Sequence, residues 1–222
     1  MKVIISLLFS ITLGFAALTA ADTAPAVAPV APSSTAPKTI LFFGDSLTAG
    51  YGLDDASIEA FPGLIQKKVT AAGLSYRVVN AGLSGETTAG GLRRIDWILR
   101  TPVDVFVLEL GGNDGLRGLP VAVAAKNLQG ILDKVRAKNP SVKFVIAGMV
   151  MPTSMGEAYT REFSAVFPAL AQTNGATLIP FLLDGVAGKA DMNLPDGFHP
   201  NVAGHQIVAD VIWKTLEPVL KE

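Results

Sequence analysis

From Lys38 onward, short apolar runs alternate with longer segments that repeat apolar residues at helical spacing. The apolar runs are bounded by turn-forming residues and have the length and β-branched content of buried parallel strands, at residues 39–43, 76–80, 103–110, 142–147 and 176–179. The helical segments cover residues 58–72, 88–99, 121–138, 159–173 and 202–220. This alternation predicts an α/β fold with a doubly wound parallel sheet and helices on both faces. In such folds ligands bind beyond the carboxyl ends of the strands, so functional residues are expected in the loops there.

The first 37 residues differ in character from the rest of the chain. Lys2, an apolar stretch at residues 3–18 and the small residues Thr19-Ala20-Ala21 form the pattern of a secretory signal peptide, cleaved after Ala20 or Ala21. The tract that follows is rich in Ala and Pro and cannot build a core. We therefore expect a signal peptide at residues 1–21, an Ala/Pro-rich linker at 22–37 and one domain at 38–222.

The alternative to a signal peptide is an uncleaved membrane anchor. The apolar stretch is shorter than the roughly 20 residues that span a bilayer, which favours the signal peptide. The chain contains no Cys, so acylation of a cysteine cannot anchor it either. These features predict a periplasmic or secreted protein without a stable membrane anchor after cleavage.

Charge and composition exclude several classes of function. The net charge is −1, and Lys and Arg are not clustered in the sequence, which argues against a nucleic-acid partner. The absence of Cys removes disulfides, thiolate nucleophiles and cysteine-ligated zinc. With only two His in addition, no metal site is expected.

Two separated motifs contain the parts of a serine hydrolase. The first predicted strand ends in Gly44-Asp45-Ser46-Leu47, and Asp196-Gly197-Phe198-His199 precedes the last predicted helix. A Ser hydroxyl needs an adjacent base to become a nucleophile, and the base needs a third group to orient it. The motifs supply these as Ser46, His199 and Asp196. Taken alone, however, Gly-Asp-Ser could equally be a turn with a capping Ser.

The second His is a weaker candidate for the base. His205 falls in the first turns of the last predicted helix, with no carboxylate at helical reach on its face, so we expect it to pack or to cover a surface. The pattern G-x-S-x-G is absent, which argues against an α/β-hydrolase fold.

Two further loops contain candidates for binding the negative charge that develops in acyl transfer. Gly85 lies in the loop after the second strand, and Asn113 follows two glycines after the third. A backbone N–H or a neutral amide can donate to an oxyanion, although both loops also have ordinary turn composition. The second loop lacks the G-x-G-x-x-G fingerprint, so a dinucleotide site gains no support. Glu109, inside the third apolar run, is expected to be paired and structural, because an unpaired buried carboxylate is costly.

In order along the chain, these four blocks resemble the SGNH branch of the GDSL esterase/lipase family. The matching blocks are Gly44-Asp45-Ser46-Leu47, Ser84-Gly85, Gly112-Asn113-Asp114 and Asp196-x-x-His199. The resemblance implies a three-layer α/β/α sandwich with a five-stranded parallel sheet of flavodoxin-like type. It also implies Ser46 as nucleophile, His199 as base, Asp196 as its partner, and an oxyanion hole made by Ser46, Gly85 and Asn113. No cofactor is needed.

Residues 108–118 are similar, more narrowly, to the periplasmic group of acyl-CoA thioesterase I, arylesterase and lysophospholipase enzymes. The expected function is therefore hydrolysis of acyl esters, small-molecule or lipid, by a secreted serine esterase or thioesterase. Leu116, Met151 and Phe198 lie near the motifs and are candidate substrate-binding residues. A carbohydrate O-acetylesterase and a non-catalytic binding module on the same fold remain as alternatives. The sequence leaves the leaving group, the chain length and the oligomeric state open.

Overall fold

The computed structural model describes residues 36–222. The signal peptide expected at residues 1–21 and residues 22–35 of the expected linker lie outside the described residues. The first strand begins at Lys38, where the sequence analysis places the start of the domain. In the described part of the chain, none of the helices combines the length and hydropathy that crossing a bilayer requires.

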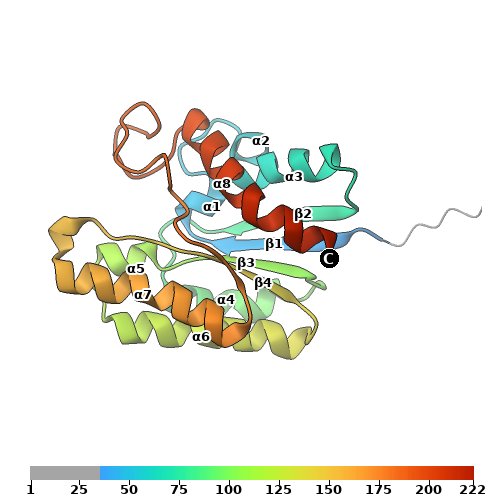
Figure 1. Cartoon of the computed structure of the whole chain (residues 1–222), viewed down its shortest axis with the longest axis horizontal. Helices are drawn as coiled ribbons and strands as arrows, with labels where there is room; N and C mark the ends of the chain where they lie inside the picture. The colour runs from blue at the N-terminus through green and yellow to red at the C-terminus, as the bar shows by residue number, and fades with distance from the viewer. Residues whose placement is uncertain (1–35) are drawn as a thin grey trace, which may run out of the picture. The chain divides into compact units, whose positions relative to one another are not determined.

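A five-stranded parallel sheet forms the middle of the molecule (Figure 1). Its strand order is β2-β1-β3-β4-β5, which confirms the predicted flavodoxin-like sheet. The strands are β1 (Lys38–Gly44), β2 (Tyr76–Gly82), β3 (Val105–Glu109), β4 (Lys143–Ala147) and β5 (Thr177–Ile179). Because β1 is flanked by β2 on one side and β3 on the other, the direction of winding reverses at β1 and β3. A crevice is expected at their carboxyl ends.

Helices cover both faces of the sheet and complete the predicted three layers (Figure 1). One face carries α3 (Phe61–Ala71) and α8 (Val202–Lys221). The other carries α4 (Thr88–Ile98), α6 (Val121–Lys138) and α7 (Glu157–Asn174). Short elements occupy the connections: α1 (Ser46–Ala49), α2 (Ala56–Glu59), α5 (Gly112–Leu116) and the 3₁₀ turn η1 (Thr153–Met155).

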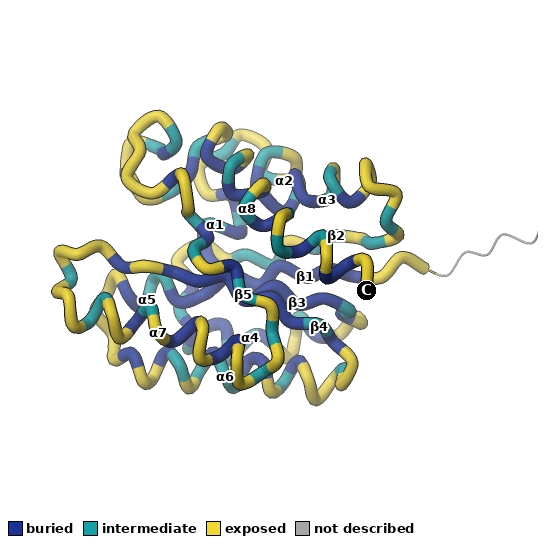
Figure 2. The backbone as a smooth tube through the Cα atoms, viewed as in Figure 1, coloured by how far each residue is buried: buried dark blue, intermediate teal, exposed yellow. Residues whose placement is uncertain are grey.

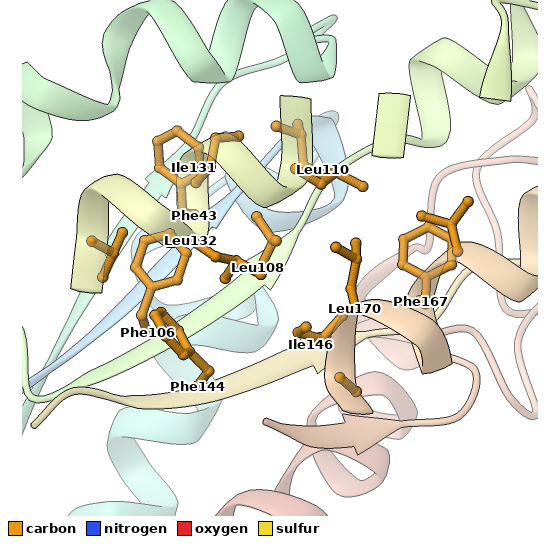
Figure 3. Close-up of a cluster of buried hydrophobic side chains, with 14 of the residues drawn as sticks. Phe43, Phe106, Leu108, Leu110, Ile131, Leu132, Phe144, Ile146, Phe167 and Leu170 are labelled. Atoms are coloured by element: carbon orange, nitrogen blue, oxygen red, sulfur yellow. The ribbon is translucent and has the colours of Figure 1, made fainter. Parts of the chain in front are cut away.

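The core is divided between the two faces by the alternation of side chains along each strand. Figure 2 shows the central strands buried throughout. Phe43 and Leu108 belong to the cluster beneath α4, α6 and α7, part of which Figure 3 shows. Their neighbours Phe42 and Val107 belong to the cluster beneath α3 and α8. Burial on both faces explains why these strands are continuous apolar runs.

One predicted helix is wrong in its extent. The segment 58–72 forms two helices, α2 and α3, because Ala60 between them is extended, with φ −67° and ψ 151°. Pro62 accounts for the break, since it has no N–H to donate and its ring would clash with the carbonyl of Ile58 in a continuous helix. The first turn of a new helix accepts Pro readily, and Pro62 occupies that position in α3.

Candidate active site

Ser46 is the first residue of α1, directly beyond the end of β1. The preceding residue, Asp45, caps this short helix by accepting a hydrogen bond from the Leu47 N–H at 3.1 Å. Gly44 is required at the turn, because a Cβ there would lie 2.3 Å from Glu109 Oε2. Ser46 is 9% exposed and lines a cavity, so its hydroxyl is buried but reachable.

The loop before α8 brings His199 and Asp196 to Ser46 across 153 residues of sequence. His199 Nε2 lies 2.9 Å from Ser46 Oγ, and His199 Nδ1 lies 2.8 Å from Asp196 Oδ2. Asn201 anchors the end of this loop by capping α8 through a 3.0 Å bond from the Gly204 N–H. The three residues that the sequence pairs as nucleophile, base and orienting acid therefore form one hydrogen-bonded chain.

The charge of Asp196 decides which nitrogen of His199 carries the proton. Burial alone would raise the pKa of Asp196, but hydrogen bonds from the His199 and Phe198 N–H groups and from the His199 ring hold it at about 2. Asp196 is therefore ionised at neutral pH and can only accept. In neutral His199 the proton then lies on Nδ1, which leaves Nε2 as an acceptor facing the Ser46 hydroxyl.

The predicted oxyanion donors lie at the ends of three strands. Gly85 has φ +79°, in the left-handed region, and lies in the loop after β2. Asn113 lies in α5 after β3 and donates from Nδ2 to Asp45 Oδ2 at 3.2 Å. Within residues 36–222, the N–H groups of Ser46 and Gly85 have no hydrogen-bond partner. Both are thus available to an incoming acceptor.

A cavity of about 610 Å³ opens at Ser46 and is lined mainly by apolar side chains. Leu116, Met151 and Phe198, the residues that the sequence indicates for substrate binding, all line it. So do Ser46, Asn113 and His199, whereas Gly85 and Asp196 do not. The volume lies within the range of about 300–1,000 Å³ that is usual for small-molecule sites. An apolar substrate portion can thus lie beside the polar chain of Ser46 and His199.

Residues 42–207 match the model of the GDSL-like lipase/acylhydrolase family. The chain belongs to this family. Esterase TesA of Pseudomonas aeruginosa is 40% identical to it over 186 residues, 83% of this chain and 90% of that protein. Thioesterase 1/protease 1/lysophospholipase L1 of Escherichia coli (strain K12) is 36% identical over 188 residues, 84% and 87% of the two chains.

Solved structures agree with the GDSL assignment. The SGNH-hydrolase family esterase AlinE4 superposes with a TM-score of 0.69 at 38% identity and covers 85% of this chain and 99% of that one. Together with the sequence relatives, this confirms the predicted family and shows that the protein is a carboxylic ester hydrolase.

Several residues around the site of Ser46, His199 and Asp196 were not predicted from sequence. Tyr51 packs its ring on the His199 imidazole, with ring centroids 4.7 Å apart. The turn after α1, with Gly50 and Gly52 both at positive φ, brings Tyr51 to this position. No sequence signal marks it, because the contact depends on the distant loop that carries His199.

Arg94 of α4 ties together the loops of the first two GDSL blocks. Its guanidinium pairs with Glu86 and donates to the carbonyls of Gly44 at 3.2 Å and Ala81 at 2.9 Å. It also lies over the ring of Phe43, 4.1 Å from the ring centroid. One side chain therefore connects the ends of β1 and β2 to the residue that follows Gly85.

A second tie connects the Gly85 loop to the Asn113 loop. Asp114, buried next to Asn113, accepts from Thr88 N at 2.8 Å and from Thr88 Oγ1 at 2.6 Å. Thr88 is the first residue of α4, three positions after Gly85. The two loops with candidate donors are thus joined through buried hydrogen bonds.

The second His does not line the cavity at Ser46. His205 lies in α8, is 1% exposed and accepts a hydrogen bond from the Phe61 N–H at 3.2 Å. Burial, with a smaller contribution from His199, lowers the pKa of His205 to about 4, so it is neutral. Of the two outcomes expected from sequence, packing is therefore the one observed.

Proposed function

We propose that this GDSL hydrolase is a secreted serine esterase or thioesterase that cleaves acyl esters through a Ser46–His199–Asp196 triad and an acyl-enzyme intermediate. The observation that carries the proposal is the continuous chain of contacts at 2.9 and 2.8 Å from Ser46 Oγ through His199 to Asp196. This geometry supplies a nucleophile, a base and an orienting carboxylate within hydrogen-bond reach.

In acylation, a bond forms between Ser46 Oγ and the substrate carbonyl carbon while the Ser46 proton passes to His199 Nε2. The imidazolium is stabilised by ionised Asp196. The tetrahedral intermediate then collapses, the bond to the leaving oxygen or sulfur breaks, and His199 donates its proton to the leaving group. In deacylation, water attacks the acyl carbon while His199 Nε2 takes a proton from the water. The bond between that carbon and Ser46 Oγ then breaks, His199 returns the proton to Ser46, and the acid leaves.

The charge on the tetrahedral intermediate would be bound by the N–H groups of Ser46 and Gly85 and by the Asn113 amide. Two of these donors lack partners within residues 36–222. The third, Asn113 Nδ2, carries two N–H groups, so it can keep its bond to Asp45 through one and donate to the oxyanion through the other. Donors that are fixed before the reaction stabilise the transition state without reorganising.

The cavity supports acyl chains longer than acetyl. Its volume of about 610 Å³ and its lining by Leu116, Met151 and Phe198 would leave most of the apolar surface uncovered around an acetyl group. Two relatives, an esterase and a thioesterase/protease/lysophospholipase, are named for activities that agree with an acyl substrate of this kind. A carbohydrate O-acetylesterase is disfavoured on the same ground.

The decisive experiment measures hydrolysis of p-nitrophenyl esters from acetyl to palmitoyl by the mature protein and by Ser46→Ala. We expect the substitution to lower kcat by about 10⁴- to 10⁶-fold. We also expect the wild-type kcat/KM to peak at a chain longer than acetyl, because longer chains bury more apolar surface in the cavity. An optimum at acetyl would favour the O-acetylesterase, and a folded Ser46→Ala protein with full turnover would exclude the triad.

Secretion is the second part of the proposal. It rests on the residue pattern at 1–21 and is tested by fractionating cells that express the full chain and sequencing the N-terminus of the product. The expected product is extracytoplasmic and begins after Ala20 or Ala21. Full-length protein confined to the cytosol would contradict it.

A further inference from the structure

Glu109 is a carboxyl group buried directly beneath the Ser46 turn. It is the last residue of β3, pairs in register with Gly44 of β1, and is 1% exposed. Every other residue of β3 is apolar and buried. An apolar side chain would suit this position better if packing alone mattered, because burying a carboxyl group costs free energy.

The contacts of Glu109 are concentrated on one oxygen. Oε2 accepts hydrogen bonds from Asp45 N at 3.2 Å, Thr48 N at 3.2 Å and Thr48 Oγ1 at 2.6 Å. The other oxygen, Oε1, has no partner within residues 36–222. Glu109 therefore binds the chain on both sides of Ser46 and leaves Ser46 itself untouched.

Of the backbone N–H groups in the Ser46 turn, all but one donate to a buried carboxyl group. Among the four N–H groups from residue 45 to 48, Glu109 takes those of Asp45 and Thr48, and the Asp45 carboxyl takes that of Leu47. Within the described residues, only the N–H of Ser46 is left without an acceptor. This is the donor required by an oxyanion that forms at a carbonyl bonded to Ser46 Oγ.

Burial, together with the nearby charge of Asp45, raises the pKa of Glu109 well above its usual value. The three hydrogen bonds require only an acceptor at the position of Oε2, for which the amide oxygen of Gln is a close substitute.

We propose that Glu109 is a positioning residue for the esterase reaction: it fixes the Ser46 turn and reserves the Ser46 N–H for the oxyanion. The inference rests on the proposed role of Ser46 as nucleophile. It predicts a loss of kcat rather than of substrate binding, since Glu109 does not line the cavity.

The test compares kcat and KM for Glu109→Gln, Glu109→Leu and the wild-type enzyme, with p-nitrophenyl ester substrates. Gln keeps the acceptor, so Glu109→Gln should keep kcat within about threefold. Leu removes the acceptor and frees the turn, so Glu109→Leu should lower kcat by about 10²-fold with KM within about threefold. The rate at which Ser46 reacts with diethyl p-nitrophenyl phosphate should fall in the same proportion as kcat.

Asp104 provides a matched control at the opposite end of the same two strands, where its carboxyl accepts from Thr39 N at 2.7 Å. Asp104→Leu removes an equivalent contact between β1 and β3 away from Ser46, and should leave kcat unchanged. An equal loss in Asp104→Leu would show that the effect of Glu109→Leu is loss of sheet stability, and would overturn the inference.

Two other outcomes would also overturn it. One is a folded Glu109→Leu protein with wild-type kcat, and the other is a Glu109→Gln protein as impaired as Glu109→Leu, which would show that charge is what matters. If Glu109→Leu does not fold, Thr48→Val decides, since it removes only the hydroxyl that orients Glu109 at 2.6 Å. We expect it to lower kcat by about tenfold, and an unchanged kcat would contradict the inference. Ser46→Ala, assayed in parallel, tests the proposed function separately, because activity there would remove the triad whatever Glu109 does.

Discussion

Asn113 is the predicted oxyanion donor whose side chain already has a partner, the Asp45 carboxyl 3.2 Å away. Burial raises the pKa of Asp45 to about 6, against the opposing effect of its bonds from Leu47 N and Asn113. The Asp45 carboxyl therefore holds Asn113 in place, and it is a weaker acid than an ordinary Asp. A donor held in this way is oriented before the substrate arrives.

Replacement of Asn113 by Ala should lower kcat by about 10²- to 10³-fold, because one donor to the developing oxyanion is lost. Steady-state kinetics on a p-nitrophenyl ester measures this. Asn127→Ala is the matched control, since Asn127 also donates a side-chain amide bond, to Thr88 Oγ1 at 3.1 Å, but does not line the cavity. Equal kcat in Asn113→Ala and wild type would remove Asn113 from the oxyanion hole.

At the scale of elements, the site is formed by loops that follow parallel strands, and buried hydrogen bonds connect these loops to one another. Arg94 joins the ends of β1 and β2, and Asp114 joins the β3 loop to the start of α4. These ties run through α4, so this helix supports the site without lining the cavity.

Helix α4 carries two ion pairs that provide an internal comparison. The side chains of Arg94 and Glu86 are 20% and 7% exposed, whereas those of Lys134 and Asp96 are 40% and 59% exposed. Arg94→Met leaves a buried carboxylate without its partner and should reduce the free energy of unfolding by about 3–5 kcal/mol. Lys134→Met removes an exposed pair and should change it by no more than about 1 kcal/mol. Urea unfolding followed by circular dichroism measures both, and equal effects would contradict the structural role of Arg94.

At the scale of the whole molecule, one sheet separates the two core clusters, and α8 packs on one of its faces. The buried His205 lies in this helix. His205 has a pKa of about 4 in the folded protein, against about 6.5 when unfolded. Because the folded value is lowered, the unfolded chain binds a proton more readily, and stability falls as the pH falls from 6.5 to 4. Asp45 and Glu109, whose pKa values are raised, act in the opposite direction.

The contribution of His205 is isolated by comparison with His205→Asn, whose Oδ1 can accept the Phe61 N–H without titrating. Between pH 7 and pH 4, the wild type should lose up to about 3 kcal/mol of unfolding free energy relative to the variant. Urea unfolding at several pH values gives the difference. Parallel stability curves for the two proteins would show that His205 does not titrate as proposed.

The sequence predicts the fold through periodicity and the candidate triad through motif order. The apolar runs mark all five strands, most clearly β1, β3 and β4, which are buried along most of their length. Asp196-x-x-His199 identifies its own pair because the contact is local. Glu109 was expected to be paired but not to hold the Ser46 turn, since that contact depends on the register of β3 beside β1. Arg94 and Tyr51 were not predicted as site residues for the same reason, because their partners come from other loops.

The central claim is that Ser46 attacks the substrate, and covalent trapping tests it most directly. The protein is incubated with diethyl p-nitrophenyl phosphate, which forms a stable bond from phosphorus to the nucleophile as p-nitrophenolate leaves, and is then digested and mapped by mass spectrometry. We predict one diethylphosphoryl group per chain, on Ser46, with loss of esterase activity in proportion to labelling. Complete inactivation with the label on another residue, or an active enzyme fully labelled at Ser46, would contradict the account.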